Sequence, residues 1–174
     1  MIFNADGLPF EGLVETLVEN GEPMNLGLYR DRVLEMNLPN SICVDCTASV
    51  EVAGLYESLL AGSVSVVTPN KKANSGELSV YRHLRETARR NGCRFLYETN
   101  VGAGLPVINT LNDLLLSGDR IVRIEAVLSG TLNFIFSSFW EGTSMSGIIA
   151  EAREKGYTEP DPRDDLSGMD GARK

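Results

Sequence analysis

The sequence has one histidine and only three cysteines among its 174 residues. A Ser-His-Asp or Cys-His hydrolase would therefore depend on a single position, His83, which lies in a charged helical stretch and is expected to be a solvated surface residue. Cys43 and Cys46 have the C-x-x-C spacing of zinc and redox sites, but no second such pair and no histidine pair completes a zinc site. We therefore interpret these cysteines as structural residues of a buried strand.

Positive charge and long apolar runs are also scarce. The formal net charge is -8, and the densest basic group, Arg89, Arg90 and Arg94, fits a solvated helix end. This balance argues against a nucleic-acid duplex or an anionic membrane as partner, because both need a basic surface. No apolar run approaches the ~20 residues of a membrane span, and the N-terminus lacks a secretory signal. We expect a soluble, cytoplasmic chain.

Short apolar runs alternate with longer amphipathic stretches in the first two thirds of the chain. Helices are predicted over 10–20, 25–36, 50–61 and 76–90, with Ser49 and Ser75 as N-caps. Strands are predicted over 42–46, 64–68 and 94–97. This alternation predicts a parallel sheet with right-handed crossovers. Ligands bind beyond the carboxyl ends of such strands, so we expect a site in the loops 45–49, 69–72 and 98–105.

The pattern changes between Leu105 and Gly118. Residues 121–128 alternate apolar and charged side chains, which predicts a strand with one solvated face, as in an antiparallel or open sheet. Helices are expected over 131–139 and 145–155, the second with a core-facing stripe. We therefore predict a second, α+β region and divide the chain into residues 1–110 and 111–174.

One expected motif is missing. A dinucleotide-binding fold usually carries G-x-G-x-x-G after its first strand, and no stretch here has that spacing in that setting. Gly102-Ala103-Gly104 is a weak echo of it. The chain also ends in an expected helix whose last carbonyls would be uncapped. We expect a fragment that begins after the first half of such a fold.

The closing segment, 156–174, is rich in acidic residues and prolines and poor in apolar ones. Pro160 and Pro162 should hold Glu159 on an extended approach to a helix starting near Asp164 or Asp165. On that helix Asp170 and Lys174 stand four residues apart and share a face, within reach of Glu159. This arrangement is a candidate site, and an acidic helix start with an ordinary surface pair is the alternative.

Four blocks in order along the chain resemble homoserine dehydrogenase, most strongly the dehydrogenase half of the bifunctional aspartokinase/homoserine dehydrogenases. They are Thr68-Pro-Asn-Lys-Lys-Ala-Asn74, Glu98-Thr-Asn-Val-Gly-Ala-Gly-Leu-Pro106, Leu128-Ser-Gly-Thr-Leu-Asn133 and the segment 156–174. The resemblance implies an α/β fold: the back half of a Rossmann-like parallel sheet over 1–110, followed by the front part of an α+β substrate and dimerisation domain over 111–174.

The resemblance also implies a reaction, the reversible NAD(P)-dependent interconversion of L-homoserine and L-aspartate 4-semialdehyde in threonine and methionine biosynthesis. Lys174 would be the proton donor, and Lys71 would lie close to the reacting centre. Glu159 and Asp170 would bind the substrate through its ammonium group, because an ammonium group is recognised by carboxylates. Gly171 departs from the family pattern, which has a β-branched apolar residue there, and the departure weakens the expected geometry between Asp170 and Lys174.

The cofactor implied is NADP or NAD, with Thr47 and Lys71 near the nicotinamide. Glu98 and three backbone carbonyls match a site for a monovalent cation, Na⁺ or K⁺; the carbonyls are those of Val101, Ala103 and Leu105. Gly102 and Gly104 would let that backbone turn its carbonyls inward.

Two other interpretations of the chain remain open. One is a non-catalytic truncated fragment that cannot bind dinucleotide, and we expect the isolated chain to be inactive. The other is a different Rossmann-type reductase of amino-acid metabolism. An exposed sheet edge predicts association into a homo-oligomer, and no nucleic-acid or membrane partner is expected.

Overall fold

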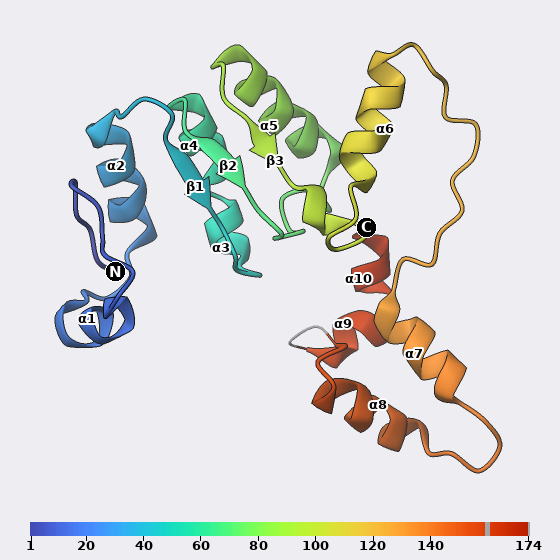
Figure 1. Ribbon diagram of the computed structural model, residues 1–174. Helices are drawn as coiled ribbons and strands as arrows, with labels where there is room; N and C mark the ends of the chain where they lie inside the picture. Colours follow the sequence, from blue (N-terminus) through green and yellow to red (C-terminus); the bar gives the residue numbers. More distant parts are fainter. Residues whose placement is uncertain (159–160, 174) are drawn as a thin grey trace.

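A three-stranded parallel sheet forms the centre of the first part of the chain. The computed structural model describes residues 1–158 and 161–173. The strands are β1 (Ile42–Val44), β2 (Ser65–Val67) and β3 (Phe95–Leu96), in the order β1-β2-β3 (Figure 1). Val66 of β2 is in register with Cys43 on one side and Phe95 on the other. The predicted parallel α/β arrangement is confirmed.

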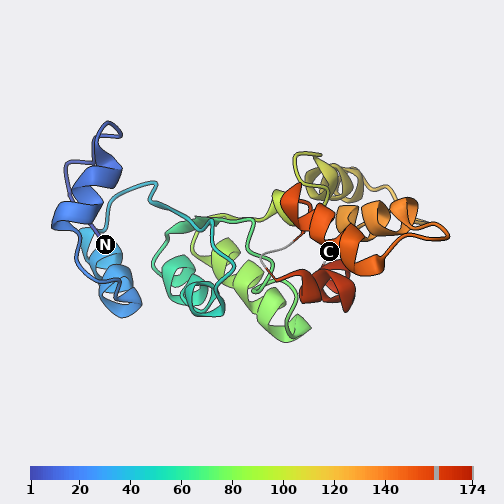
Figure 2. The same cartoon turned by 90° about the horizontal axis from the view of Figure 1, so that it is seen from below.

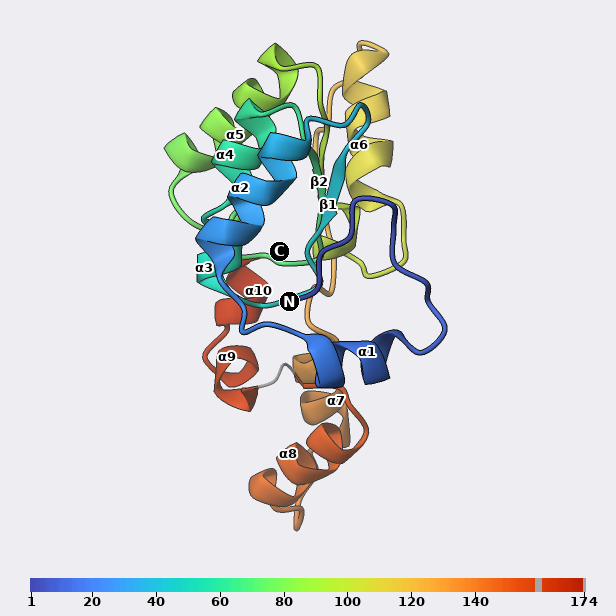
Figure 3. The ribbon, with the colours of Figure 1, turned by 90° about the vertical axis from the view of Figure 1, so that its left-hand side faces the viewer.

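Helices cover the two faces of this sheet unequally. Five helices lie before β3, and α6 follows it: α1 (Leu13–Asn20), α2 (Leu26–Met36), α3 (Val50–Ala53), α4 (Tyr56–Ala61), α5 (Leu78–Arg90) and α6 (Val107–Leu116). Figure 3 shows α2, α4 and α5 on one face and α6 on the other. A 3-10 turn, η1 (Glu98–Asn100), connects β3 to the loop before α6.

The core lies between the sheet and the helices α4 and α5. Tyr56, Leu59, Leu60 and Val66 are fully buried there, and the Tyr56 ring packs edge-on against Phe95 at 5.7 Å between centroids. The opposite face of β1 is open to solvent, where Ile42 and Val44 are 61% and 64% exposed. The first part of the chain therefore has its core on one side of the sheet.

Several helices depart from their predicted bounds; α1, predicted from residue 10, begins at Leu13. The helix expected over 50–61 is broken at Gly54 and Leu55 into α3 and α4, although Ser49 caps it as predicted by accepting a bond from Val52 N. The cap predicted at Ser75 is wrong. The helix α5 begins at Leu78, and the Ser75 hydroxyl donates instead to the Lys71 carbonyl at 2.8 Å. A local turn at Lys71 therefore takes the side chain that would have capped the helix.

The strand predicted over 121–128 is also wrong. Residues 119–129 have no regular secondary structure, and Val122 and Val127 are 90% and 78% exposed. A strand exists only through pairing with another strand, and no segment of the described chain pairs with this one. The alternating pattern alone is not enough to form a strand, and no strand among residues 1–158 or 161–173 pairs with this segment.

The second part of the chain is helical. Its elements are α7 (Gly130–Ser138), α8 (Met145–Glu154), α9 (Pro162–Leu166) and α10 (Met169–Ala172). Figure 2 shows this group at the end of the molecule opposite α1. Ile135 of α7 is buried with Ile148 and Ala152 of α8, whereas Met145, expected in the same stripe, is 40% exposed.

The closing helix begins two or three residues earlier than expected and is interrupted. It begins at Pro162 with Asp161 as N-cap, and Gly168, at φ +76°, separates α9 from α10. Within the described residues no helix has the length and apolar character required to cross a bilayer.

The one-sided core predicts a strong position dependence for leucine truncation. Leu60→Ala should lower the free energy of unfolding by about 2 to 5 kcal/mol, because it leaves a cavity beneath the sheet. The same substitution at Leu116, which is 86% exposed, should change it by less than about 0.5 kcal/mol. Urea denaturation followed by circular dichroism measures both, and equal effects would contradict the placement of the core.

Candidate functional site

The three loops at the carboxyl edge of the sheet are joined by buried polar side chains. Asp45 follows β1, Thr68 and Asn70 follow β2, and Asn100 follows β3. Each of the four is no more than 3% exposed. Buried polar groups require hydrogen-bond partners, so these side chains must satisfy one another or the loop backbone.

The Asp45 carboxylate is the centre of this network. Its Oδ1 accepts from Thr47 N at 2.7 Å, and its Oδ2 accepts from Asn70 Nδ2 at 2.9 Å. The Tyr56 hydroxyl, from α4 beneath, donates to Oδ2 as well. The loop after β1 and the loop after β2 are thus connected through one side chain.

Thr68 and Asn70 extend the network into the loop backbone. Thr68 Oγ1 donates to the Asp45 carbonyl at 3.0 Å and accepts from Asn70 N at 2.8 Å. Asn70 Nδ2 also donates to the Ser49 carbonyl, while its Oδ1 accepts from Lys72 N. The backbone around Lys71 is therefore held on both sides by Asn70.

Asn100 brings in the third loop. With its amide oriented to satisfy its neighbours, Nδ2 donates to the Pro69 carbonyl at 2.9 Å and to the Thr68 carbonyl at 3.3 Å. Its Oδ1 accepts from Asn74 Nδ2 at 2.8 Å. The prediction that all three loops form one edge is consistent with these contacts.

Asp45 is held in its ionised form. Burial by itself would raise the pKa of this carboxyl, but the hydrogen bonds from Tyr56, Asn70 and Thr47 favour the charged state and lower its pKa overall. Burial and the bond to Asp45 raise the pKa of Tyr56, which stays a neutral donor. The pair is therefore a carboxylate and a phenol at neutral pH.

The two predicted cofactor residues lie at this edge. Thr47 is exposed, its backbone N–H is held by Asp45, and its Oγ1 accepts from Ser49 N at 3.1 Å. Lys71 is half-buried in the turn after β2, and its carbonyl accepts from Ser75 N and Ser75 Oγ. Because β1 and β2 are neighbours in the sheet, the structure brings these two loops side by side.

The predicted cation residues lie between η1 and α6. Both carboxylate oxygens of Glu98 accept from the start of α6, Oε1 from Ile108 N at 2.7 Å and Oε2 from Asn109 N at 2.8 Å. The Leu105 carbonyl accepts from Val107 N. Within the described residues, the carbonyls of Val101 and Ala103 accept no hydrogen bond. Glu98 therefore caps a helix here, and only its remaining lone pairs are available to an ion.

The turn in this loop depends on a different pair of residues from the one expected. Gly102 has φ +74°, and a Cβ there would lie 2.9 Å from Val107 Cγ2. Ala103, at φ +50°, is the other left-handed residue, while Gly104 has an ordinary φ and open space around it. The expectation that Gly104 is needed for the turn is therefore wrong.

A second buried pair holds the closing segment. Thr131 Oγ1, at the start of α7, lies 2.8 Å from Asp165 Oδ1 and also bonds to the Tyr157 carbonyl. Arg173 donates to Asp164 at 2.8 Å, which ties α10 back to α9. A hydrogen bond from Arg163 lowers the pKa of Asp161 to about 2. These contacts fix the backbone that leads to position 170.

Of the three residues predicted to bind and protonate the substrate, only Asp170 lies among the described residues. Glu159 and Lys174 lie outside the described residues. Asp170 lies in α10, and only its backbone is described. Beside it, a Cβ on Gly171 would meet no atom within 4 Å, so the family's β-branched residue would fit there. The convergence of these three side chains stays a prediction.

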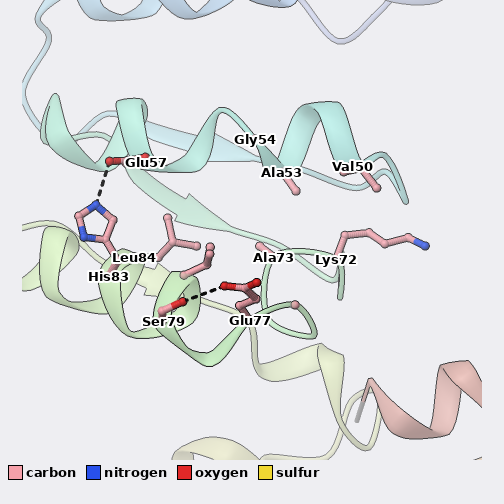
Figure 4. A pocket seen from close by; sticks show the side chains of 12 residues that line it. Val50, Ala53, Gly54, Glu57, Lys72, Ala73, Glu77, Ser79, His83 and Leu84 are labelled. Carbon is pink, nitrogen blue, oxygen red and sulfur yellow. Dashed lines mark hydrogen bonds and ion pairs between the residues drawn. The ribbon is translucent and has the colours of Figure 1, made fainter.

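His83 lies away from the strand ends, in a groove of about 520 Å³ between α3–α4 and α5. Figure 4 shows its ring joined to Glu57 across the groove, with 2.8 Å between Nε2 and Oε1. The nearby Ser79 hydroxyl donates to Glu77. The histidine therefore bridges two helices, and its partner is a carboxylate. The cysteines are free thiols; Cys43 is buried and Cys46 exposed.

Sequence reasoning missed the residues that hold the loops together. Tyr56 lies in the predicted helix 50–61, where an aromatic residue indicates only a core position. Asn100 lies close to Gly102 and Gly104, whose pattern indicates only a turn. The available signal was the position of Asp45, Thr68 and Asn100, each a short polar side chain within five residues of a buried strand residue. Such positions are buried when loops pack on one another.

The fold and this edge define the class of protein: a Rossmann-type nucleotide-binding sheet followed by a helical region. The family model described as "Homoserine dehydrogenase, NAD binding domain" matches residues 19–98, and the model described as "Homoserine dehydrogenase" matches residues 106–174. The two matches follow one another along most of the chain. The chain belongs to the homoserine dehydrogenase family, and its first part is that family's NAD(P)-binding domain.

Curated relatives match the whole chain but are much longer. The bifunctional aspartokinase/homoserine dehydrogenase of Haemophilus influenzae is 48% identical over 174 residues, which are 100% of this chain and 21% of that protein. A chloroplastic bifunctional enzyme of Arabidopsis thaliana is 45% identical and covered over 19% of its length. The homoserine dehydrogenase of Paracoccidioides brasiliensis is 48% identical over 77% of this chain. The chain thus spans about a fifth of the bifunctional relatives.

Solved structures agree with the family. A hyperthermophilic archaeal homoserine dehydrogenase in complex with NADPH aligns with a TM-score of 0.75 at 30% identity, over 94% of this chain and 50% of that one. The homoserine dehydrogenase of Thermoplasma acidophilum aligns with a TM-score of 0.74 at 25% identity, over 96% of this chain and 52% of that one.

The buried Asp45 predicts a specific acid sensitivity. Its folded pKa is lowered, so its ionised form stabilises the fold above the unfolded pKa of about 3.9, and this contribution is lost as pH falls from there through the folded value. Asp45→Asn should therefore cost stability at pH 7, and the difference from the unaltered protein should shrink toward pH 3. Urea midpoints across this range measure it. Asp113→Asn, at an exposed position of α6, is the control and should change the free energy of unfolding by less than about 0.5 kcal/mol at pH 7. Parallel curves for Asp45→Asn and the unaltered protein would contradict the assignment.

Proposed function

We propose that this chain carries the nicotinamide-facing part of a homoserine dehydrogenase, and that the full-length protein interconverts L-homoserine and L-aspartate 4-semialdehyde with NADP or NAD. The observation that supports it most is the convergence of three loops at the carboxyl edge of β1, β2 and β3, in a chain that matches both parts of this family in order. In open α/β sheets this edge is where ligands bind. We assign cofactor binding to residues 1–110 and substrate binding to residues 111–174.

Thr47 and Lys71 fit a nicotinamide coenzyme at this edge. The Thr47 hydroxyl is exposed beyond β1, and the Lys71 turn is fixed by Asn70, so a hydrogen-bonding group and a cation stand on adjacent loops. A bound coenzyme supplies the hydride that the reduction needs and accepts it in the reverse direction. Lys71 also contributes positive charge near the oxygen that gains electron density.

The substrate is an amino acid with a hydroxyl or aldehyde at its far end. Lys174 donates a proton to the aldehyde oxygen during reduction and takes it back from the homoserine hydroxyl during oxidation. Glu159 and Asp170 bind the substrate ammonium group, which distinguishes this aldehyde from those without an amino group. The hydrogen bonds of Thr131 to Asp165 and of Arg173 to Asp164 support this role, because they hold the segment 161–173, in which Asp170 lies.

A monovalent cation, Na⁺ or K⁺, is proposed beside the turn of Gly102. Glu98 supplies a carboxylate, and the carbonyls of Val101 and Ala103 have lone pairs to spare. The Leu105 carbonyl contributes through its second lone pair. Carbonyl and carboxylate oxygens suit a weakly charged hard ion. We further propose that the protein is a homo-oligomer. The apolar side chains of the segment 121–128 and those on the open face of β1 are exposed, and contact with a second copy would bury them.

Replacing the proposed proton donor tests the chemistry. In the full-length protein, Lys174→Ala should lower kcat for homoserine oxidation at least about a hundredfold, because the step loses its general acid and base. NADPH affinity, measured by fluorescence titration, should change less than about twofold if the cofactor loops are separate from this residue. Lys155→Ala, at a half-exposed lysine paired with Glu151, is the matched control and should leave kcat unchanged. Unchanged turnover in Lys174→Ala would overturn its assignment.

The proposed cation site predicts a salt effect that depends on ion identity. At constant ionic strength, Na⁺ or K⁺ should raise turnover above that in tetramethylammonium, an ion too large for the turn. Glu98→Gln should abolish this difference, because it removes the only carboxylate among the four ligands. Glu154→Gln, an exposed carboxylate at the end of α8, should retain it. Equal turnover in all three salts would exclude a functional cation.

A further inference from the structure

We propose that Asp45 and Tyr56 are positioning residues that clamp the loop of Thr47 to the loop of Lys71, so that cofactor affinity depends on a buried carboxylate that does not itself contact the cofactor. This inference rests on the proposed function. Both residues lie in the described chain. Asp45 belongs to the loop 45–49, where a site is expected, but the family resemblance implies no role for either residue.

The clamp is visible in the contacts of a single carboxylate. Asp45 Oδ1 holds Thr47 N at 2.7 Å, and Asp45 Oδ2 holds Asn70 Nδ2 at 2.9 Å. Asn70 precedes Lys71 and also bonds to the Ser49 carbonyl at 2.9 Å. The backbone on both sides of the gap between the loops is thereby tied to the same group.

Tyr56 fixes that carboxylate from below. It is fully buried in α4, its hydroxyl donates to Asp45 Oδ2, and the same hydroxyl lies 3.0 Å from Thr68 Oγ1. The ring itself is locked by the core, against Phe95 of β3. The position of the carboxylate is therefore set by the hydrophobic core, which transmits its rigidity to the loops.

The surroundings keep the clamp in one charge state. Three titratable groups interact electrostatically with Asp45: Tyr56 of α4, Cys43 of β1 and Tyr29 of α2. Burial raises the pKa of all three, so they are neutral at neutral pH, and Asp45 is the charged member of the group. An ionised carboxylate can accept from all of its donors at once, whereas a protonated one would place its own O–H against one of these donors.

A positioning role and a merely structural role can be separated by which measured property falls when the residue is replaced. A structural defect loosens the core and lowers all activities together. Loss of the clamp should loosen only the two loops and weaken the cofactor more than the substrate, because a preformed site avoids the entropy of ordering its loops on binding.

The test uses Tyr56→Phe in the full-length protein, which removes the hydroxyl and keeps the ring. NADPH affinity by fluorescence titration should fall about five- to tenfold, because only part of the free energy of one hydrogen bond to a charged group is lost from the preformed site. The KM for homoserine should change less than about twofold. Hydrogen exchange should accelerate in peptides covering 45–49 and 68–74 and stay unchanged in those covering 59–66.

Tyr29→Phe is the matched control. It removes a hydroxyl beside the same strand whose hydrogen bond is to Cys43 Sγ, at 3.6 Å, and not to a residue of either loop, so NADPH affinity and loop exchange should be unchanged. Asn70→Ala is measured in parallel, since it breaks the clamp from the loop side without disturbing the core. It should reproduce the loss of affinity and the faster exchange, even if Tyr56→Phe does not fold.

The outcomes separate the inference from the proposed function. NADPH affinity and loop exchange within twofold of the unaltered protein in both Tyr56→Phe and Asn70→Ala would overturn the clamp and leave the proposed function standing. An equal loss in Tyr29→Phe would show a general structural effect and would also overturn it. An unaltered full-length protein that binds no NADPH and oxidises no homoserine would overturn the proposed function, and the inference with it.

Discussion

A buried carboxylate has to be satisfied, and in this protein the requirement organises the whole edge of the sheet. Asp45 is almost completely removed from solvent, and without its donors an ionised group in that position would be strongly destabilising. Those donors come from three places: the loop after β1, the loop after β2 and the helix α4 beneath them. The hydrogen bonds that satisfy Asp45 thus hold Thr47 and the backbone around Lys71 in one arrangement. Asn100 connects the third loop to them.

Different parts of this sheet provide stability and carry the candidate site. One face of the sheet packs against α4 and α5 and supplies stability through residues such as Leu59 and Leu60. The carboxyl edge carries polar loops on that rigid base, as functional sites commonly do. The helical region beyond α6 has its own small core and its own buried polar pair, Thr131 and Asp165. The backbone that leads to Asp170 is therefore anchored independently of the sheet.

Prediction from sequence was best where local signals and tertiary packing agree. The parallel strands were predicted because short apolar runs alternate with longer helical stretches, and the structure has them in register. The helix α2 was predicted over 25–36, and in the structure the Asn25 side chain caps it by accepting from Leu28 N. It failed where the deciding partner lies far away in sequence. Residues 121–128 have the alternation of a strand but no strand to pair with in the described chain. Ser75 has the composition of a cap but bonds to Lys71.

The sequence by itself determined the family and the order of the elements, because motifs and periodicity are properties of neighbouring residues. Through the family resemblance it also indicated Thr47, Lys71 and Glu98, and their roles stay predictions. Only the tertiary structure decided that Asp45, Tyr56, Thr68 and Asn70 meet, since residues up to 25 positions apart must be brought together before a carboxylate can be buried among donors. It likewise decided that Glu98 caps α6, and that Gly102 with Ala103 makes the turn beside it. Local pattern specifies what each segment can form, and packing selects which polar groups find one another.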